Sequence, residues 1–112
     1  MEPEGLTTKP WYQGKWKRED AEAFLAGKPN GTFVVRASSQ KDRLALSHTH
    51  HSGTIVHAII EISWKGYCLR EADRPEVWHP TVTKLLSSFR FTYYDEATGN
   101  SFFPDGSPAP AV

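Results

Sequence analysis

The sequence predicts an α+β domain in which a central antiparallel β-sheet is flanked by two α-helices. Segments rich in β-branched and aromatic residues follow one another through short turns in the middle of the chain, which is the pattern of an antiparallel sheet. One amphipathic segment precedes this run and a second follows it, so each helix can cover one face. The apolar runs "FVV" and "IVHAII" suit strands that are buried on both faces.

The first helix is predicted over Lys17–Gly27, because Ala21, Phe24 and Leu25 recur at helical spacing and the glycine is a typical stop. Strands follow, separated by polar turns at 38–42 and 50–53 and by a tight turn at Lys65-Gly66. They are predicted at Thr32–Arg36, Arg43–Thr49, Ile55–Ser63 and Tyr67–Arg70.

The second helix is predicted over Pro80–Phe89, after a long loop at 71–79. Val82, Leu85 and Leu86 fall on one face with the final phenylalanine, and the proline suits a first turn. Two short extended pieces are predicted beyond it, at Phe91–Tyr94 and Ser101–Pro104.

The bulk properties indicate one cytoplasmic domain. A chain of 112 residues fits a single domain, and 13 basic against 13 acidic residues do not give the positive field of a nucleic-acid binder. The single Cys68 excludes an internal disulfide, and no stretch has the character of a membrane span or a signal peptide. We expect a loose lead-in at 1–10, the domain at 11–104 and a mobile Pro-rich tail at 105–112.

Arg36 ends an apolar strand and shares its face with Val34, so its charge points toward the helix that covers that face. A buried arginine keeps its charge and needs an anion. The sequence leaves open whether that anion is internal or external. The internal candidates are Glu19, Asp20, Glu22 and Asp42. An external phosphate would find hydroxyl groups, backbone amides and a cation in the following loop, which contains Ser38, Ser39 and Lys41.

Several segments together resemble the Src homology 2 (SH2) family, which binds phosphotyrosine peptides. They are, in order, "WYQGKWKREDAEAFL", "NGTFVVRASS", "RLALSHT", "IVHAIIEI", "GYCL" and "PTVTKLLSSF". The family's opening motif is matched by Trp11, Tyr12, Gly14, Arg18, Ala21, Glu22 and Leu25, and its strand signature by Phe33, Val34, Val35, Arg36 and Ser38. The resemblance covers roughly Trp11–Phe89 and implies the same fold.

The resemblance also implies the roles of individual residues. Arg36 corresponds to the arginine that holds the phosphate bidentately, and Arg18 to the helix arginine that reaches the phosphate and the ring. Ser38, Ser39 and Lys41 belong to the phosphate-binding loop, and His57 to the strand histidine that lines the pocket. The implied function is a phosphotyrosine-dependent peptide-binding module of intracellular signalling.

Some residues depart from the family pattern. Ile59 stands where many members have a lysine, so one arm over the tyrosine ring is missing, and Trp16 replaces a smaller aliphatic residue. Residues after the phosphotyrosine are expected to be read by a pocket whose candidate residues are Ala58, Ile59, Ile60, Tyr67, Leu69, Trp78, Phe89 and Tyr93.

Other interpretations stay open beside this one. The arginine pocket can be degenerate and hold an internal acid, in which case the domain binds partners without phosphorylation. A phosphate-handling enzyme is disfavoured, because Cys68 lies in an apolar strand and the nucleophile motifs of known enzymes are missing. A metal site at His48, His50 and His51 is disfavoured too, since these residues flank an ordinary polar turn. We expect no cofactor, and a monomeric module of a larger protein.

Overall fold

The computed structural model describes residues 6–109 except 51–52, 71–74, 90 and 96. Parts of the predicted turn at 50–53 and of the loop at 71–79, and His51, therefore lie outside the described residues. The described elements are η1 (Leu6–Thr8), α1 (Arg18–Leu25), β1 (Phe33–Ala37), β2 (Arg43–Thr49), β3 (Ile55–Ser63), β4 (Gly66–Arg70), α2 (Val82–Ser87), β5 (Tyr93–Asp95) and β6 (Asn100–Phe102). They confirm the α+β architecture.

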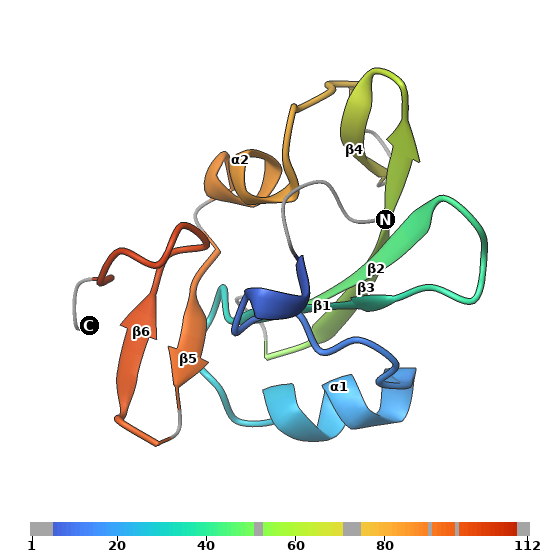
Figure 1. Ribbon diagram of the computed structural model, residues 1–112. Helices are drawn as coiled ribbons and strands as arrows, with labels where there is room; N and C mark the ends of the chain where they lie inside the picture. Colours follow the sequence, from blue (N-terminus) through green and yellow to red (C-terminus); the bar gives the residue numbers. More distant parts are fainter. Residues whose placement is uncertain (1–5, 51–52, 71–74, 90, 96, 110–112) are drawn as a thin grey trace.

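The central sheet has the order β1-β2-β3-β4, and every neighbouring pair is antiparallel. In Figure 1, α1 lies on one side of this sheet and α2 on the other, while β5 and β6 form a separate hairpin near the C-terminus. The register places Arg36 opposite Ala45 and Ser47 opposite His57. Because these residues share a face, three polar side chains from three strands come together under α1.

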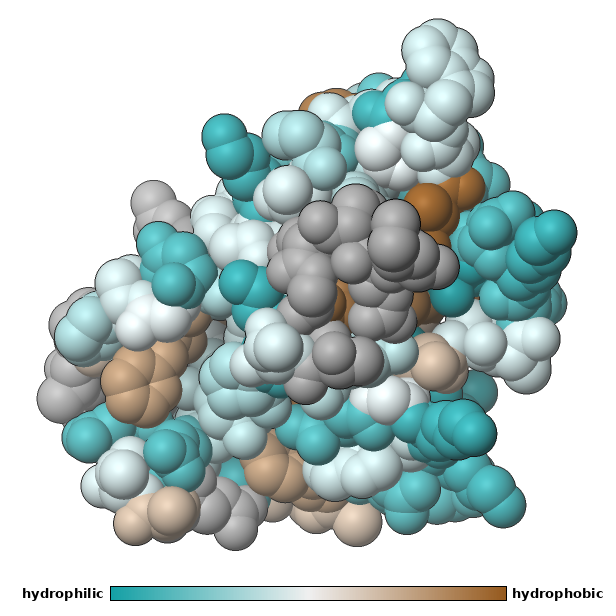
Figure 2. Space-filling view, in the orientation of Figure 1, coloured by the Kyte–Doolittle hydropathy of each residue, from teal (hydrophilic) through white to brown (hydrophobic). Residues whose placement is uncertain are grey.

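Two apolar clusters confirm the predicted alternation of β1. On the α1 side, Val34 packs against Ala21 and Leu25 of the helix. On the α2 side lies the larger cluster, which includes Phe33, Val35, Leu46, Ile60, Leu85 and Leu86. The side of the molecule shown in Figure 2 is mostly hydrophilic and carries only small, separate hydrophobic areas.

Both main helices are shorter than predicted. The α1 helix ends at Leu25, and Gly27 lies beyond it at φ +75°, in the left-handed region that glycine adopts without strain. The α2 helix begins at Val82, because the Thr81 side chain accepts a hydrogen bond from the Lys84 amide and so acts as the N-cap. The predicted first turn at Pro80 therefore lies outside the helix.

The described parts of the lead-in and of the tail contact the domain. Leu6 is 1% exposed and belongs to the α2-side cluster, because the η1 turn folds it back over the sheet. Trp11 is also buried, and its indole N–H donates to the Pro104 carbonyl at 2.9 Å. The Ala109 amide donates to the Ser101 carbonyl, so the described part of the tail returns to β6. None of the described helices has the length and apolar character needed to cross a membrane.

Candidate phosphate site

Arg36, Ser47 and His57 lie side by side on β1, β2 and β3, on the face covered by α1. The Arg36 Nε–H donates to the Ser47 hydroxyl oxygen at 3.3 Å. That hydroxyl lies 2.7 Å from Nδ1 of His57, and Nη2 of Arg36 lies 3.5 Å from the same ring nitrogen. Ser47 is fully buried, so it fixes its two neighbours from beneath.

The α1 helix adds a carboxylate and a second arginine to this group. Nε2 of His57 lies 3.0 Å from Oε2 of Glu22, and the same oxygen is 3.6 Å from Nε of Arg18. Arg18 and Glu22 are four residues apart on one helical face, which brings both side chains toward the sheet. The hydrogen bond from His57 is the main reason why the pKa of Glu22 is lowered from its ordinary value.

Arg36 makes no ion pair with a carboxylate among the residues that the structure describes. Of the internal partners considered from sequence, Glu22 pairs with His57 and Arg18, and the Asp20 carboxylate accepts from the Lys17 backbone amide. Burial, followed by the positive charge of Arg18, lowers the pKa of Arg36. The guanidinium is therefore held by a hydroxyl group and an imidazole, and no described carboxylate contacts it.

The loop after β1 contributes less directly. The Ser38 hydroxyl accepts a hydrogen bond from the Gln40 amide at 3.1 Å, and Ser39 is exposed. Lys41 is exposed as well and lines a hollow of about 500 Å³ at the far end of the sheet. Of the predicted phosphate-site residues, Arg36 and His57 are in direct contact, and Arg18 is linked to them through Glu22. Ser38 and Ser39 follow the end of β1. Lys41 lines the hollow of about 500 Å³ instead.

The residues predicted to read the peptide separate into five places. Leu69 and Phe89 line a hollow of about 200 Å³, together with Pro75, Val77, His79 and Ser88. Ala58, Ile60 and Tyr67 are buried in the cluster on the α2 side. Ile59 is half-buried on the α1 face, opposite Ala45 and Arg70.

Trp78 and Tyr93 lie away from that 200 Å³ hollow. The Trp78 ring faces the hollow of about 500 Å³, where Lys65 and Arg70 approach it within 5.5 and 5.7 Å. Tyr93 stacks on Phe24 of α1 at 6.3 Å between ring centroids. Neither ring lines the space around Leu69 and Phe89.

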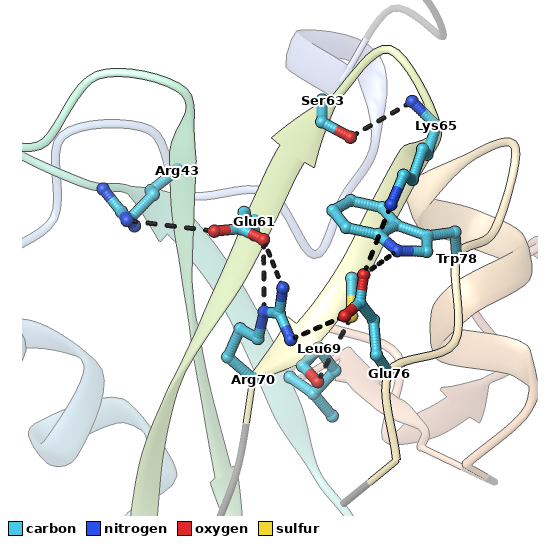
Figure 3. Close-up of polar contacts among 9 residues, drawn as sticks. Arg43, Glu61, Ser63, Lys65, Leu69, Arg70, Glu76 and Trp78 are labelled. Carbon is cyan, nitrogen blue, oxygen red and sulfur yellow. Dashed lines mark hydrogen bonds and ion pairs between the residues drawn. The ribbon is translucent and has the colours of Figure 1, made fainter.

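A second group of charged side chains occupies the opposite end of the same sheet face, and Figure 3 shows it in detail. Glu61 accepts two hydrogen bonds from Arg70, at 3.1 and 2.7 Å, and lies 3.9 Å from Arg43. Glu76 pairs with Arg70 and Lys65 and accepts from the Trp78 indole. We call these six residues the paired cluster, since each of its cations has a carboxylate partner.

Two residues of the phosphate site were not assigned a role from sequence. The sequence placed Ser47 in a strand, and it gave Glu22 as a match to the family's opening motif and as a possible ion-pair partner of Arg36. A usable signal existed for Ser47, because a serine that alternates with apolar residues in a buried strand needs a polar neighbour. The strand register that supplies this neighbour is not visible in a single sequence.

The chain matches the SH2 domain family model over residues 11–87. It is 40% identical over 86 residues to human Suppressor of cytokine signaling 5, an alignment that covers 76% of this chain and 16% of that protein. It is 38% identical over 87 residues to mouse Suppressor of cytokine signaling 4, covering 76% and 20%. Protein vav-1 of Caenorhabditis elegans is 38% identical over 80 residues, covering 71% and 8%.

Solved structures of SH2 domains share the fold. The solution structure of the human VAV1 SH2 domain superposes with a TM-score of 0.61 at 24% identity, covering 80% of this chain and 62% of that one. The SH2 domain of the Monosiga brevicollis CRK/CRKL homolog gives 0.56 at 27% identity, covering 75% and 79%. The chain spans at most a fifth of the length of the relatives named above. It belongs to the SH2 domain family of phosphotyrosine-binding signalling modules.

Proposed function

We propose that this domain binds phosphotyrosine peptides by holding the phosphate with Arg36 and Arg18 and reading later residues at the hollow beside Leu69 and Phe89. The observation that carries the proposal is that Arg36 is oriented by Ser47 and His57 but has no carboxylate contact among the described residues. A phosphate dianion supplies the missing charge, and a guanidinium matches its oxygens bidentately.

The hydrogen bonds of Arg36 support a defined mode of contact. Its Nε–H is used by Ser47, so the two terminal nitrogens provide the N–H groups for the phosphate. Arg18 is two-thirds exposed, and its ion-pair partner among the described residues is Glu22 of the same helix, which allows its side chain to reach a ligand. Ser38, at the end of β1, adds a hydroxyl group on the same side.

The hollow beside Leu69 and Phe89 supports the second half of the proposal. It lies on the α2 side of the domain and is lined mainly by apolar residues, as a pocket for an apolar side chain of the peptide requires. Ile59 provides no cation on β3, so Arg18 is the cation we assign to the tyrosine ring.

The test is a binding titration with a library of phosphotyrosine peptides varied at the three positions after the phosphotyrosine, each with its unphosphorylated twin. We expect only phosphorylated peptides to bind, and Arg36→Ala to abolish most of the affinity in a folded protein. Equal binding of the twins would establish the alternative, a degenerate pocket. Unfolding of Arg36→Ala would instead assign the arginine to the stability of the core.

The role in a whole protein is part of the proposal. We propose a monomeric module within a longer cytoplasmic signalling protein, and the longer parent protein is supported by relatives that are several times longer than the matched region. In that setting the domain brings its parent protein to a tyrosine-phosphorylated partner, and this binding role needs no catalytic group.

A further inference from the structure

The chain of hydrogen bonds from Arg36 to α1 assigns a role to Glu22. We infer that Glu22 is a positioning residue of the phosphate site, which sets the direction of every hydrogen bond between itself and Arg36. The inference rests on the proposed function for its effect on phosphate binding. Its structural part, the protonation pattern of His57, is testable without any ligand.

The direction of these hydrogen bonds is fixed first at the carboxylate of Glu22. An ionised carboxylate only accepts hydrogen bonds, and Oε2 of Glu22 lies 3.0 Å from Nε2 of His57. Nε2 must therefore carry a proton and donate it. The same oxygen also faces Nε of Arg18 at 3.6 Å, so two donors converge on it.

The other ring nitrogen lies among donors. A guanidinium only donates, and Nη2 of Arg36 is 3.5 Å from Nδ1 of His57. Nδ1 is therefore the acceptor, and the ring is neutral with its proton on Nε2. The Ser47 hydroxyl, 2.7 Å away, then donates its single proton to Nδ1 and uses a lone pair to accept from Nε of Arg36.

The three hydrogen bonds therefore all run in one direction: Arg36 donates to Ser47, Ser47 donates to His57, and His57 donates to Glu22. This chain of hydrogen bonds occupies the Nε side of Arg36 and leaves the outer N–H groups of the guanidinium for a ligand. Without the carboxylate, the ring is free to move its proton to Nδ1, which then opposes Nη2 of Arg36 and reverses the hydrogen bond with the Ser47 hydroxyl. We expect the guanidinium to lose its fixed orientation in that state.

Glu22 also has two effects that oppose this one. Its negative charge repels a phosphate, and its ion pair holds Arg18. Both effects predict tighter phosphate binding when Glu22 is replaced. Two variants separate the contributions, because Glu22→Gln removes the charge but keeps an acceptor oxygen, whereas Glu22→Ala removes both. Making each variant in an Arg18→Ala background removes the second opposing effect.

The experiment uses the full 112-residue chain and phosphotyrosine, the free amino acid, as the probe. The nitrogen chemical shifts of His57 report which ring nitrogen carries the proton in the ligand-free protein. We expect the proton on Nε2 in the unaltered protein and in Glu22→Gln, and a mixture of both forms in Glu22→Ala. In the Arg18→Ala background we expect Glu22→Ala to weaken phosphotyrosine binding about tenfold, and Glu22→Gln not to weaken it.

The inference is overturned if Glu22→Ala leaves the ring proton on Nε2, if it binds phosphotyrosine as tightly as its background, or if Glu22→Gln weakens binding equally. Glu22→Met, which keeps the length of the side chain without its oxygens, replaces Glu22→Ala should the latter not fold. A failure of the proposed function looks different, since Arg36→Ala would then leave phosphotyrosine binding unchanged while the His57 measurement still decides the hydrogen-bond direction.

Discussion

Two groups of charged residues share one face of the sheet, and they use arginine in opposite ways. In the paired cluster, Arg70 makes two hydrogen bonds to Glu61 and also pairs with Glu76. At the candidate phosphate site, the polar contacts of Arg36 with the described residues are to a hydroxyl group and an imidazole. The same side chain is a structural cross-link where a carboxylate meets it and a candidate ligand contact where none does.

Substitution of each arginine by alanine gives the largest contrast. We expect Arg36→Ala to lose phosphopeptide affinity on the order of 2–5 kcal/mol, because a desolvated, charge-assisted contact is removed. Arg70→Ala is the matched control, from the same face and with a carboxylate partner, and should bind normally. Titration calorimetry measures both affinities. Equal losses in the two variants would remove the distinction between the two groups.

The paired cluster can also be broken through the backbone. Gly66 lies at φ +116°, and a side chain there would collide with the His79 carbonyl oxygen, so Gly66→Ala must displace the segment that carries Glu76 and Trp78. We expect the free energy of unfolding to fall by about 3 kcal/mol. Chemical denaturation measures this loss, and Gly106→Ala, at a positive φ but in open space, is the control.

Measuring phosphotyrosine binding by the same Gly66→Ala variant tests whether the paired cluster and the candidate phosphate site are independent. The displaced segment does not touch Arg36, Ser47 or His57, so phosphotyrosine itself should bind the folded protein with unchanged affinity. A parallel loss of phosphotyrosine binding would show that the two groups are coupled through the sheet.

A smaller effect is expected from the ion pairs of Glu61. Its carboxylate serves both Arg43 and Arg70, so Glu61→Gln should lower the melting temperature slightly, and salt should reduce the difference from the unaltered protein. Glu19→Gln, at an exposed position of α1, is the control for loss of one negative charge. A difference that grows with salt would contradict an electrostatic origin.

The smallest expected effect is the acid dependence of Glu22. Its pKa in the folded protein is lowered below the ordinary value of 4.5, chiefly by the hydrogen bond from His57. The resulting stabilisation is therefore present above pH 4.5 and is lost as the pH falls through the lowered pKa. Melting temperatures of the unaltered protein and Glu22→Gln should converge in that range, and a constant gap would argue against this contact.

The strands were more predictable from sequence than the helix ends. The bounds of β2 and β3 agree with prediction, since alternating apolar residues between turn residues define a strand locally. The start of α2 depends on whether Thr81 or Pro80 ends the preceding extended segment, which is a matter of cap geometry. Leu6 was missed because nothing in a polar lead-in shows that one leucine folds back into the core.

The phosphate site was predicted in part for a similar reason. Strand alternation and the family motif together predicted Arg36 and His57 as candidate residues of this site. The hydrogen-bonded position of Ser47 depends on the register between strands, and the contact of Glu22 depends on how α1 packs on the sheet. Trp78 and Tyr93 were predicted near the peptide pocket because they lie in the two loops that flank it in the family, and only the three-dimensional path of the chain places them away from the hollow at Leu69 and Phe89.

The bond between the Trp11 indole and the Pro104 carbonyl has a consequence for where this module ends. The segment shared with the family stops at residue 87, yet the cap over this indole is supplied by a stretch well past that border. A shortened chain cut at the shared border would remove the hydrogen-bond partner of this buried indole, although Phe33 would still pack against the ring. The region that matches the family is therefore shorter than the region that makes the contacts of this fold. A protein made for study should include the longer region, at least to Pro104.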